Sequence, residues 1–292
     1  MFPEELGRRF GDYVRSIRND GYKSGSKKEI MDEINKHLKK SVAARMEGRK
    51  TGIAFSGGLD STMIAKSAFD LKKDFLLLSV GFENSQDIKY ARKIAGYYGW
   101  PLKIRIISMD DAEKIVKNVV CMLKTDDIVK IGVGCVVYSV LELARDNNVD
   151  VVFGGLGAEE IFAGYDRHRK KYIENPEDVH EECWRGLENL YQQDLKRDSI
   201  IAGHFGIRLL APFLDDEMIK YAMKIDPRLK VSENDRKIIL KETALHIGII
   251  NEFAMRKKKA AQYGSYFHQA LNKLARSNGC KTRKDYIHSI TR

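Results

Sequence analysis

The stretch Thr51-Gly52-Ile53-Ala54-Phe55-Ser56-Gly57-Gly58-Leu59-Asp60-Ser61 decides the fold class of this chain. Its first five residues form a short apolar run that predicts a buried strand. Ile64, Ala68 and Leu71 then recur at helical spacing, so a helix follows the two glycines. A strand that turns into a helix through a glycine-rich loop is a typical place for an anion to bind.

The same pattern continues along the chain as strands alternating with helices. Short apolar runs at residues 51–55, 75–80, 102–107 and 150–153 predict four strands. Apolar residues spaced i, i+3, i+4 predict helices around residues 64–71, 88–95, 112–123 and 133–144. This alternation predicts an α/β fold with a doubly wound, mostly parallel sheet, whose ligands bind beyond the carboxyl ends of the strands.

Helical patterns flank this α/β region on both sides. Before it, apolar residues recur every fourth position from Ile30 to Met46, after a Gly/Ser/Lys-rich loop at residues 21–28. After Tyr172 the strand signals stop, and helices are expected at residues 181–197, 215–223, 236–248 and 266–277. We therefore expect a helical lead-in at residues 1–48, an α/β domain at 49–172 and a C-terminal helical lobe at 173–292 that completes the site.

Composition narrows the class of protein. The 292 residues carry a formal charge of +10, which favours polyanionic partners such as nucleotides or RNA without choosing between them. The four cysteines form no C-x-x-C pair, so neither a disulfide framework nor a cysteine-based metal site is expected. The longest apolar run, residues 131–141, is too short to cross a bilayer, and the acidic start does not match a signal peptide. We expect a cytoplasmic protein with no membrane association.

The loop at residues 56–61 has the chemistry of a phosphate site. Two glycines let the backbone amides approach a ligand closely, and the helix that follows adds partial positive charge at its N-terminus. Ser56 and Ser61 can donate hydroxyl hydrogen bonds, whereas Asp60 beside a phosphate makes sense only if Mg²⁺ lies between the two anions. The alternative is a glycine turn in which Asp60 and Ser61 cap the helix.

These residues resemble the S-G-G-x-D-S pyrophosphate loop, or PP-loop, of the N-type ATP pyrophosphatases and not the Walker motif, which the chain lacks. The resemblance implies an adenine nucleotide alpha hydrolase-like fold and cleavage of ATP between its α and β phosphates. That group contains both amide-forming ligases and tRNA-modifying enzymes, so a second motif is needed to distinguish between these two classes.

The second motif is residues 154–165, GGLGAEEIFAGY, directly after the fourth expected strand. It is similar to the S-G-E-G-x-D-E-x-F-x-G-Y signature of the synthetase domain of asparagine synthetases. Residues 211–215 (APFLD) and 256–265 (RKKKAAQYGS) resemble later segments of that domain, in the same order. With its R-H-R at residues 167–169, the chain most resembles a stand-alone archaeal and eukaryotic branch that lacks the glutaminase domain.

The resemblance implies a role for each matching residue. The ATP phosphates are expected on Ser56, Gly57, Gly58, Leu59, Asp60 and Ser61, and the nucleoside on Val80, Gly154 and Gly155. Mg²⁺ is expected on Asp60 and Glu159. Asp60 is expected to act in catalysis together with Lys237 and a tail lysine, Lys258 or else Lys259. The two lysines would neutralise the pyrophosphate.

The substrate side of the motif set departs from the family pattern. Leu156 stands where the family has a glutamate, Gly132 where it has an arginine, and Leu210 replaces a second arginine. Asp127 matches a family aspartate ahead of the substrate helix, or else is simply a helix N-cap. For Leu156 the alternative is a side chain that packs against the following helix.

From the resemblance we expect an AMP- and PPi-forming ligase that adenylates a small-molecule carboxylate for capture by ammonia or an amine. About 50 residues precede the first strand, too few for a glutaminase, so nitrogen is expected free or from a separate amidotransferase partner. Two rivals remain open: a tRNA-modifying PP-loop enzyme, suggested by the positive charge, and a nucleotide-binding scaffold without turnover, suggested by Leu156.

Overall fold

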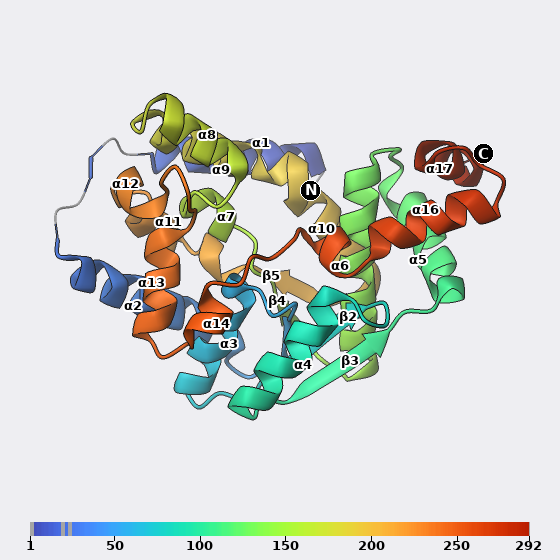
Figure 1. Cartoon of the computed structure of the whole chain (residues 1–292), viewed down its shortest axis with the longest axis horizontal. Coiled ribbons are helices and arrows are strands. Elements are labelled where there is room, and N and C mark those ends of the chain that lie inside the picture. The colour runs from blue at the N-terminus through green and yellow to red at the C-terminus, as the bar shows by residue number, and fades with distance from the viewer. Residues whose placement is uncertain (1–2, 19–20, 23–24, 292) are drawn as a thin grey trace.

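The computed structural model describes residues 3–18, 21–22 and 25–291, so residues 23 and 24 of the expected loop lie outside the described part. At its centre is a five-stranded sheet in which every neighbouring pair is parallel, in the order β3-β2-β1-β4-β5 (Figure 1). The strands are β1 (Thr51–Ala54), β2 (Leu76–Gly81), β3 (Leu102–Ile106), β4 (Val151–Phe153) and β5 (Arg208–Leu210). The expected doubly wound parallel α/β fold is confirmed.

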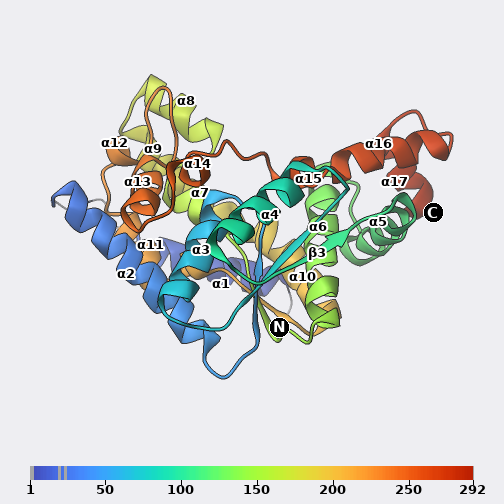
Figure 2. The same cartoon turned by 60° about the horizontal axis from the view of Figure 1, so that its bottom comes forward.

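Alternation along the strands divides the core into two clusters, one on each face of the sheet. Ile53, Leu77 and Val151 point to one face, and their neighbours Ala54, Leu78 and Val152 point to the other. The first face is covered by α2 (Lys27–Met46), α3 (Leu59–Asp70) and α4 (Gln86–Tyr98). The second is covered by α5 (Met109–Leu123) and α6 (Ile128–Asp146) (Figure 2).

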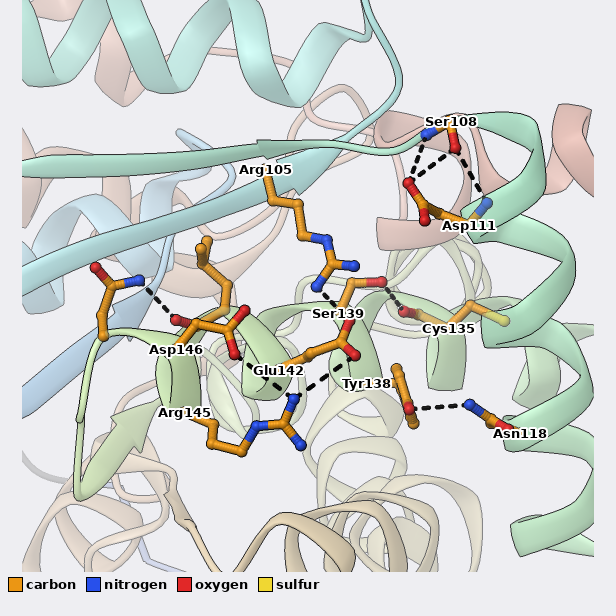
Figure 3. Close-up of polar contacts among 12 residues, drawn as sticks. Arg105, Ser108, Asp111, Asn118, Cys135, Tyr138, Ser139, Glu142, Arg145 and Asp146 are labelled. Atoms are coloured by element: carbon orange, nitrogen blue, oxygen red, sulfur yellow. Dashed lines mark hydrogen bonds and ion pairs between the residues drawn. The ribbon is translucent and has the colours of Figure 1, made fainter.

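Local sequence determines where several of these helices begin. Ser26 opens α2 and Ser108 opens α5, each in a capping box with the acidic residue three positions later. Figure 3 shows the second box together with contacts that hold α6 in place. There Arg105 of β3 pairs with Glu142, and Asn118 of α5 donates to the Tyr138 hydroxyl at 3.0 Å.

The chain after residue 172 is mostly helical, as expected, but it also supplies β5, which the sequence analysis missed. β5 pairs with β4 and forms one edge of the sheet. The helices here are α9 (Asp178–Leu190), π-helix η1 (Tyr191–Leu195), α10 (Lys196–Phe205), 3-10 helix η2 (Pro212–Leu214), α11 (Asp216–Ala222), α12 (Pro227–Lys230), α13 (Ile238–His246), α14 (Asn251–Ala254), α15 (Ala261–Gly264), α16 (Phe267–Ser277) and α17 (Arg283–Thr291). Earlier in the chain lie α7 (Ala158–Ile161), α8 (Asp166–Glu174) and α1 (Pro3–Ser16), and neither α8 nor α1 was predicted from the sequence.

These later helices cover both faces of the sheet. The helices α9, α11 and α13 join the cluster that contains α2, whereas α10, α16 and α17 join the cluster that contains α5 and α6. Figure 1 shows α11 and α13 toward the left of the molecule and α16 and α17 at the right, with the 255–260 segment running between them. None of the helices in the described part of the chain has the length and apolar character needed to cross a bilayer.

Candidate active site

The strand order places two loops side by side at the carboxyl edge of the sheet. β1 and β4 are neighbours, and the chain leaves β1 for α3 on one face while α6, on the other face, leads into β4. Such a switch point leaves a crevice between the two loops. A cavity of about 640 Å³ opens here, lined by residues of the 56–61 loop, of the 154–157 loop and of the 258–262 tail.

The loop after β1 presents backbone amides to this cavity. Gly57 has φ +67°, and a Cβ there would lie 2.9 Å from Cβ of Tyr90, so only glycine fits. Gly58 is the N-cap of α3 and makes no side-chain capping bond. Ser61 donates its hydroxyl to the Gly58 carbonyl at 3.1 Å instead of capping the helix. The first amides of α3 are therefore available to an anion.

Three of the residues singled out in the sequence converge on one point. Lys237 Nζ lies 2.7 and 2.9 Å from the two carboxylate oxygens of Asp60 and 2.8 Å from Oε1 of Glu159. Burial alone would lower the pKa of Lys237, but the two carboxylates outweigh it and raise that pKa. Burial alone would raise the pKa of Glu159, but Lys237 outweighs it and lowers that pKa. The cluster thus sets two carboxyl groups against one ammonium group.

This cluster suits a magnesium ion. Burial raises the pKa of Asp60 even with Lys237 beside it, so the anionic carboxylate calls for more positive charge than one ammonium supplies. Within the described residues no group of three His, Cys, Asp or Glu side chains is placed to hold a metal. A pair of carboxylates fits Mg²⁺, which commonly takes one or two carboxylates and completes its shell with phosphates and water.

Close packing between the 56–61 loop and the 154–157 loop keeps Asp60 near Glu159. A Cβ on Gly155 would lie 2.8 Å from Cβ of Asp60, so the 154–157 loop can pack against the start of α3 only because that position is glycine. Gly154, Gly155 and Val80, which the sequence analysis expected near the nucleoside, all line the cavity.

The tail segment crosses the PP-loop and brings a lysine to it. The Lys258 side chain lies over Gly58, with Cδ 2.6 Å from where a Cβ would be, and Lys258 lines the cavity. Lys259, the other candidate, is not among the lining residues. Arg256 anchors the segment, because Nη1 donates to the Ser56 carbonyl at 2.6 Å and Nη2 to Oδ1 of Asp87 at 3.2 Å.

Neither Arg256 nor Asp87 was assigned a role from the sequence. Both side chains are 4% exposed, and the Arg256 guanidinium also lies 3.9 Å from the centre of the Tyr90 ring. The sequence signal for Asp87 was its position just past the carboxyl end of β2, where site residues of a parallel sheet gather. No local sequence pattern points to its partner Arg256, which is 169 residues away along the chain.

A second polar group lines the cavity near β4 and β5 and was also missed. The Tyr165 hydroxyl donates to Oε1 of Glu160 at 2.7 Å, and burial raises the pKa of Glu160 to about 7. Arg197 is held between Asp194 and Asp198, at 2.7 Å from each. The sequence signal was the i, i+3 spacing of Asp194 and Arg197. In the structure Asp194 lies in the π-helix η1, and such irregular turns are frequent at functional sites.

Three of the expected site residues present no side chain to the cavity, and a fourth, Leu156, lines it while also packing against the core. Asp127 caps α6, accepting from the amides of residues 129 and 130 at 2.8 and 3.0 Å, and is not among the lining residues. Gly132 is not among them either, and a Cβ there would lie 3.1 Å from Cβ of Gln262. The Leu59 side chain is buried in the core, which leaves only its backbone for a phosphate.

Comparison with known proteins agrees with these observations. The model of the asparagine synthase family matches residues 33–178 and 171–286. The chain is 34% identical over 295 aligned residues to a putative glutamine-hydrolyzing asparagine synthetase of Methanocaldococcus jannaschii, covering 90% of this chain and 54% of that protein. It is 31% identical over 229 residues to the glutamine-hydrolyzing asparagine synthetase of Cricetulus griseus, covering 75% of this chain and 40% of the relative.

The chain thus spans about half the length of the curated relatives it matches. Among solved structures, the NMN synthetase of Francisella tularensis aligns with a TM-score of 0.45 and 12% identity, over 91% of this chain and 94% of that one. The family model covers nearly the whole α/β core together with the 256–265 tail, and on that match the chain belongs to the asparagine synthase family.

Proposed function

We propose that this chain is an ATP-dependent ligase that adenylates a small-molecule carboxylate and passes the acyl group to ammonia or an amine, releasing AMP and PPi. The observation that carries the proposal is the cluster of Asp60, Glu159 and Lys237 beside the uncapped N-terminus of α3. Family membership supports the same chemistry.

The reaction has two steps. A carboxylate oxygen of the substrate bonds to the α-phosphorus of ATP while the bond from that phosphorus to the bridging oxygen breaks, and PPi leaves. The nitrogen of ammonia or the amine then attacks the acyl carbon, AMP leaves with the shared oxygen, and the nitrogen loses a proton. Both steps need two bound reactants in one cavity, which supplies proximity.

The residues of the chain divide the work of the first step. Amides of the 57–61 segment bind phosphate oxygens, and the ammonium groups of Lys237 and Lys258 offset the charge that develops on the departing PPi. Asp60 and Glu159 would hold Mg²⁺, which supplies further positive charge at the phosphates. Arg256 keeps the tail, and with it Lys258, over the loop. Ammonia would arrive free or from a separate amidotransferase partner.

The test is ATP–PPi exchange, screened across amino acids and small carboxylates with Mg²⁺ present. Asp60→Asn should abolish exchange while the circular dichroism spectrum stays native. Asp70→Asn, on the same helix but paired with Lys66 and Lys39 away from the cavity, is the matched control and should keep exchange. Wild-type exchange rates in Asp60→Asn would remove the proposal.

The same assay separates the two rival functions. ATP binding without exchange for any carboxylate would indicate a scaffold without turnover. Tight RNA binding with a steep dependence on salt, and exchange only when RNA is present, would indicate a tRNA-modifying enzyme.

A further inference from the structure

One buried polar side chain in the cavity wall has no part in the site described so far. Gln262 of α15 lines the cavity and is 5% exposed. Its Oε1 is buried and accepts no hydrogen bond from any residue that the structure describes. A buried acceptor without a donor carries a free-energy penalty, so this position favours a ligand that brings an N–H or O–H group.

Contacts on two sides fix the place of α15. The Phe82 amide, just past the end of β2, donates to the Ser265 carbonyl at 3.1 Å. On the other side α15 packs on α6, where a Cβ at Gly132 would lie 3.1 Å from Cβ of Gln262 (Figure 2). Because Gly132 has no side chain, Gln262 has room there. Gln262 is thus held between the carboxyl end of β2 and the N-terminal part of α6.

Aliphatic side chains lie beside Gln262 on one face of the sheet. Leu78 and Val80 of β2 belong to the core cluster that contains α6, and α6 packs directly on β2. Val136 packs against the same cluster and lies one helical turn beyond Gly132, on the same side of α6. Leu78, Val80, Val136 and Gln262 all line the cavity. We call the part of the cavity beside these four residues the Gln262 slot.

A short segment connects the Gln262 slot to the PP-loop. Lys258, four residues before Gln262, lies over Gly58. Four residues of chain span at most about 14 Å, so the Cα atoms of Lys258 and Gln262 are no farther apart than that. A nucleotide whose phosphates bind the PP-loop can therefore place its base in the Gln262 slot.

An adenine ring matches the chemistry of this slot. Its flat faces suit contact with aliphatic side chains, and its 6-amino group brings N–H donors to the ring edge. Guanine has a carbonyl oxygen at position 6, which is an acceptor and would leave Oε1 of Gln262 unpaired. The unpaired oxygen of Gln262 therefore favours adenine over a base with an oxygen at that position.

We propose, on the basis of the function proposed above, that Gln262 determines the choice of nucleobase. Its Oε1 accepts a hydrogen bond from the 6-amino group of ATP bound in the Gln262 slot. The PP-loop binds the triphosphate whatever the base is, whereas Gln262 separates ATP from nucleotides that lack this amino group. Base selection thus resides in the same tail that carries Lys258 over the PP-loop.

The experiment removes the two partners of this hydrogen bond, separately and together. The ligands are ATP and purine riboside 5′-triphosphate, which lacks only the 6-amino group, and the variant is Gln262→Met, which keeps the length of the side chain. Isothermal titration calorimetry of the full chain with Mg²⁺ should show about tenfold weaker binding of the purine analogue to the wild type. Gln262→Met should bind the two nucleotides equally, because the partner of the amino group is gone.

Three controls accompany this comparison. Inorganic pyrophosphate has no base, so it should bind the wild type and Gln262→Met equally. Gln269→Met, at an exposed position of α16, is the matched variant and should keep the tenfold preference for ATP. Gln262→Leu is the second variant, in case methionine disturbs the packing on Gly132.

The outcomes separate this inference from the proposed function. Equal binding of ATP and the purine analogue to the wild type overturns the inference about Gln262 and leaves the ligase proposal standing. A tenfold preference for ATP that persists in Gln262→Met overturns it as well. Failure of the wild type to bind either ATP or pyrophosphate removes the ligase proposal and this inference with it.

Discussion

Among the residues that the structure describes, Lys237 is the cation that forms ion pairs with both Asp60 and Glu159, so its loss should weaken this site strongly. Lys237→Met should destabilise the fold by about 3 kcal/mol, at the low end for a broken buried pair because Glu159 is 38% exposed. Mg²⁺ should restore part of that stability, since a divalent cation can take the place of the lost ammonium. Urea denaturation with and without Mg²⁺ measures both effects.

Lys66→Met provides the comparison for this variant. Lys66 also pairs with an aspartate of α3, but its partner Asp70 lies at the far end of the helix and contacts Lys39 as well. The loss of unfolding free energy in Lys66→Met should be smaller than in Lys237→Met and independent of Mg²⁺. A Lys237→Met variant whose stability ignores Mg²⁺ would speak against a metal site on Asp60 and Glu159.

The 255–260 segment is the element that connects the helical region to the PP-loop. Arg256→Lys keeps the charge but cannot bridge the Ser56 carbonyl and Asp87 at once. Loss of one charged hydrogen bond is worth about 1.5 kcal/mol, so KM for ATP should rise about tenfold, with a smaller change in kcat.

Asp87→Asn should give a similar increase, and the double variant should be less than additive because both substitutions break one contact. Lys257→Met, the neighbour in the same segment, is the control. Full additivity would mean that Arg256 acts on the loop without Asp87. Steady-state kinetics of the exchange reaction supply all four values.

Two buried groups, His168 and Glu160, make the stability of the whole molecule depend on pH in opposite directions. Burial and Arg167 lower the pKa of His168 to about 3, so its contribution is lost as the pH falls below about 6.5, where the unfolded chain takes up a proton. Burial raises the pKa of Glu160 to about 7, so its contribution is lost as the pH rises above about 4.5, where the unfolded chain releases a proton.

Between about pH 4.5 and 6.5 the two slopes oppose each other, each near 1.4 kcal/mol per pH unit at most. Glu160→Gln should expose the histidine slope, with stability rising with pH. His168→Asn, which keeps an acceptor for the Tyr165 amide, should expose the glutamate slope, with stability falling as pH rises. Unfolding free energies of both variants at pH 5, 5.5 and 6 test this prediction. Slopes of the same sign in the two variants would contradict it.

At the scale of the whole chain, periodicity predicted four of the five strands and the four helices that alternate with them. The exception, β5, has three residues and lies on the sheet edge, too short a run for an alternating pattern to stand out. The predicted partition at residues 48 and 172 stays a prediction, because segments from beyond residue 172 pack on both faces of the sheet.

The amino-acid sequence by itself determined the strand–loop–helix unit at residues 51–71, the alternation behind the parallel sheet, and the residue types that a phosphate site needs. These depend on local spacing, which a sequence displays directly. Tertiary structure alone decided which candidates meet. Lys237 reaches Asp60 across 177 positions and Arg256 reaches Asp87 across 169, whereas Asp127 satisfies its own helix. Such contacts form only when the chain has folded around the sheet. Which residues distant in sequence meet is set by the packing of the whole chain and not by their spacing along it.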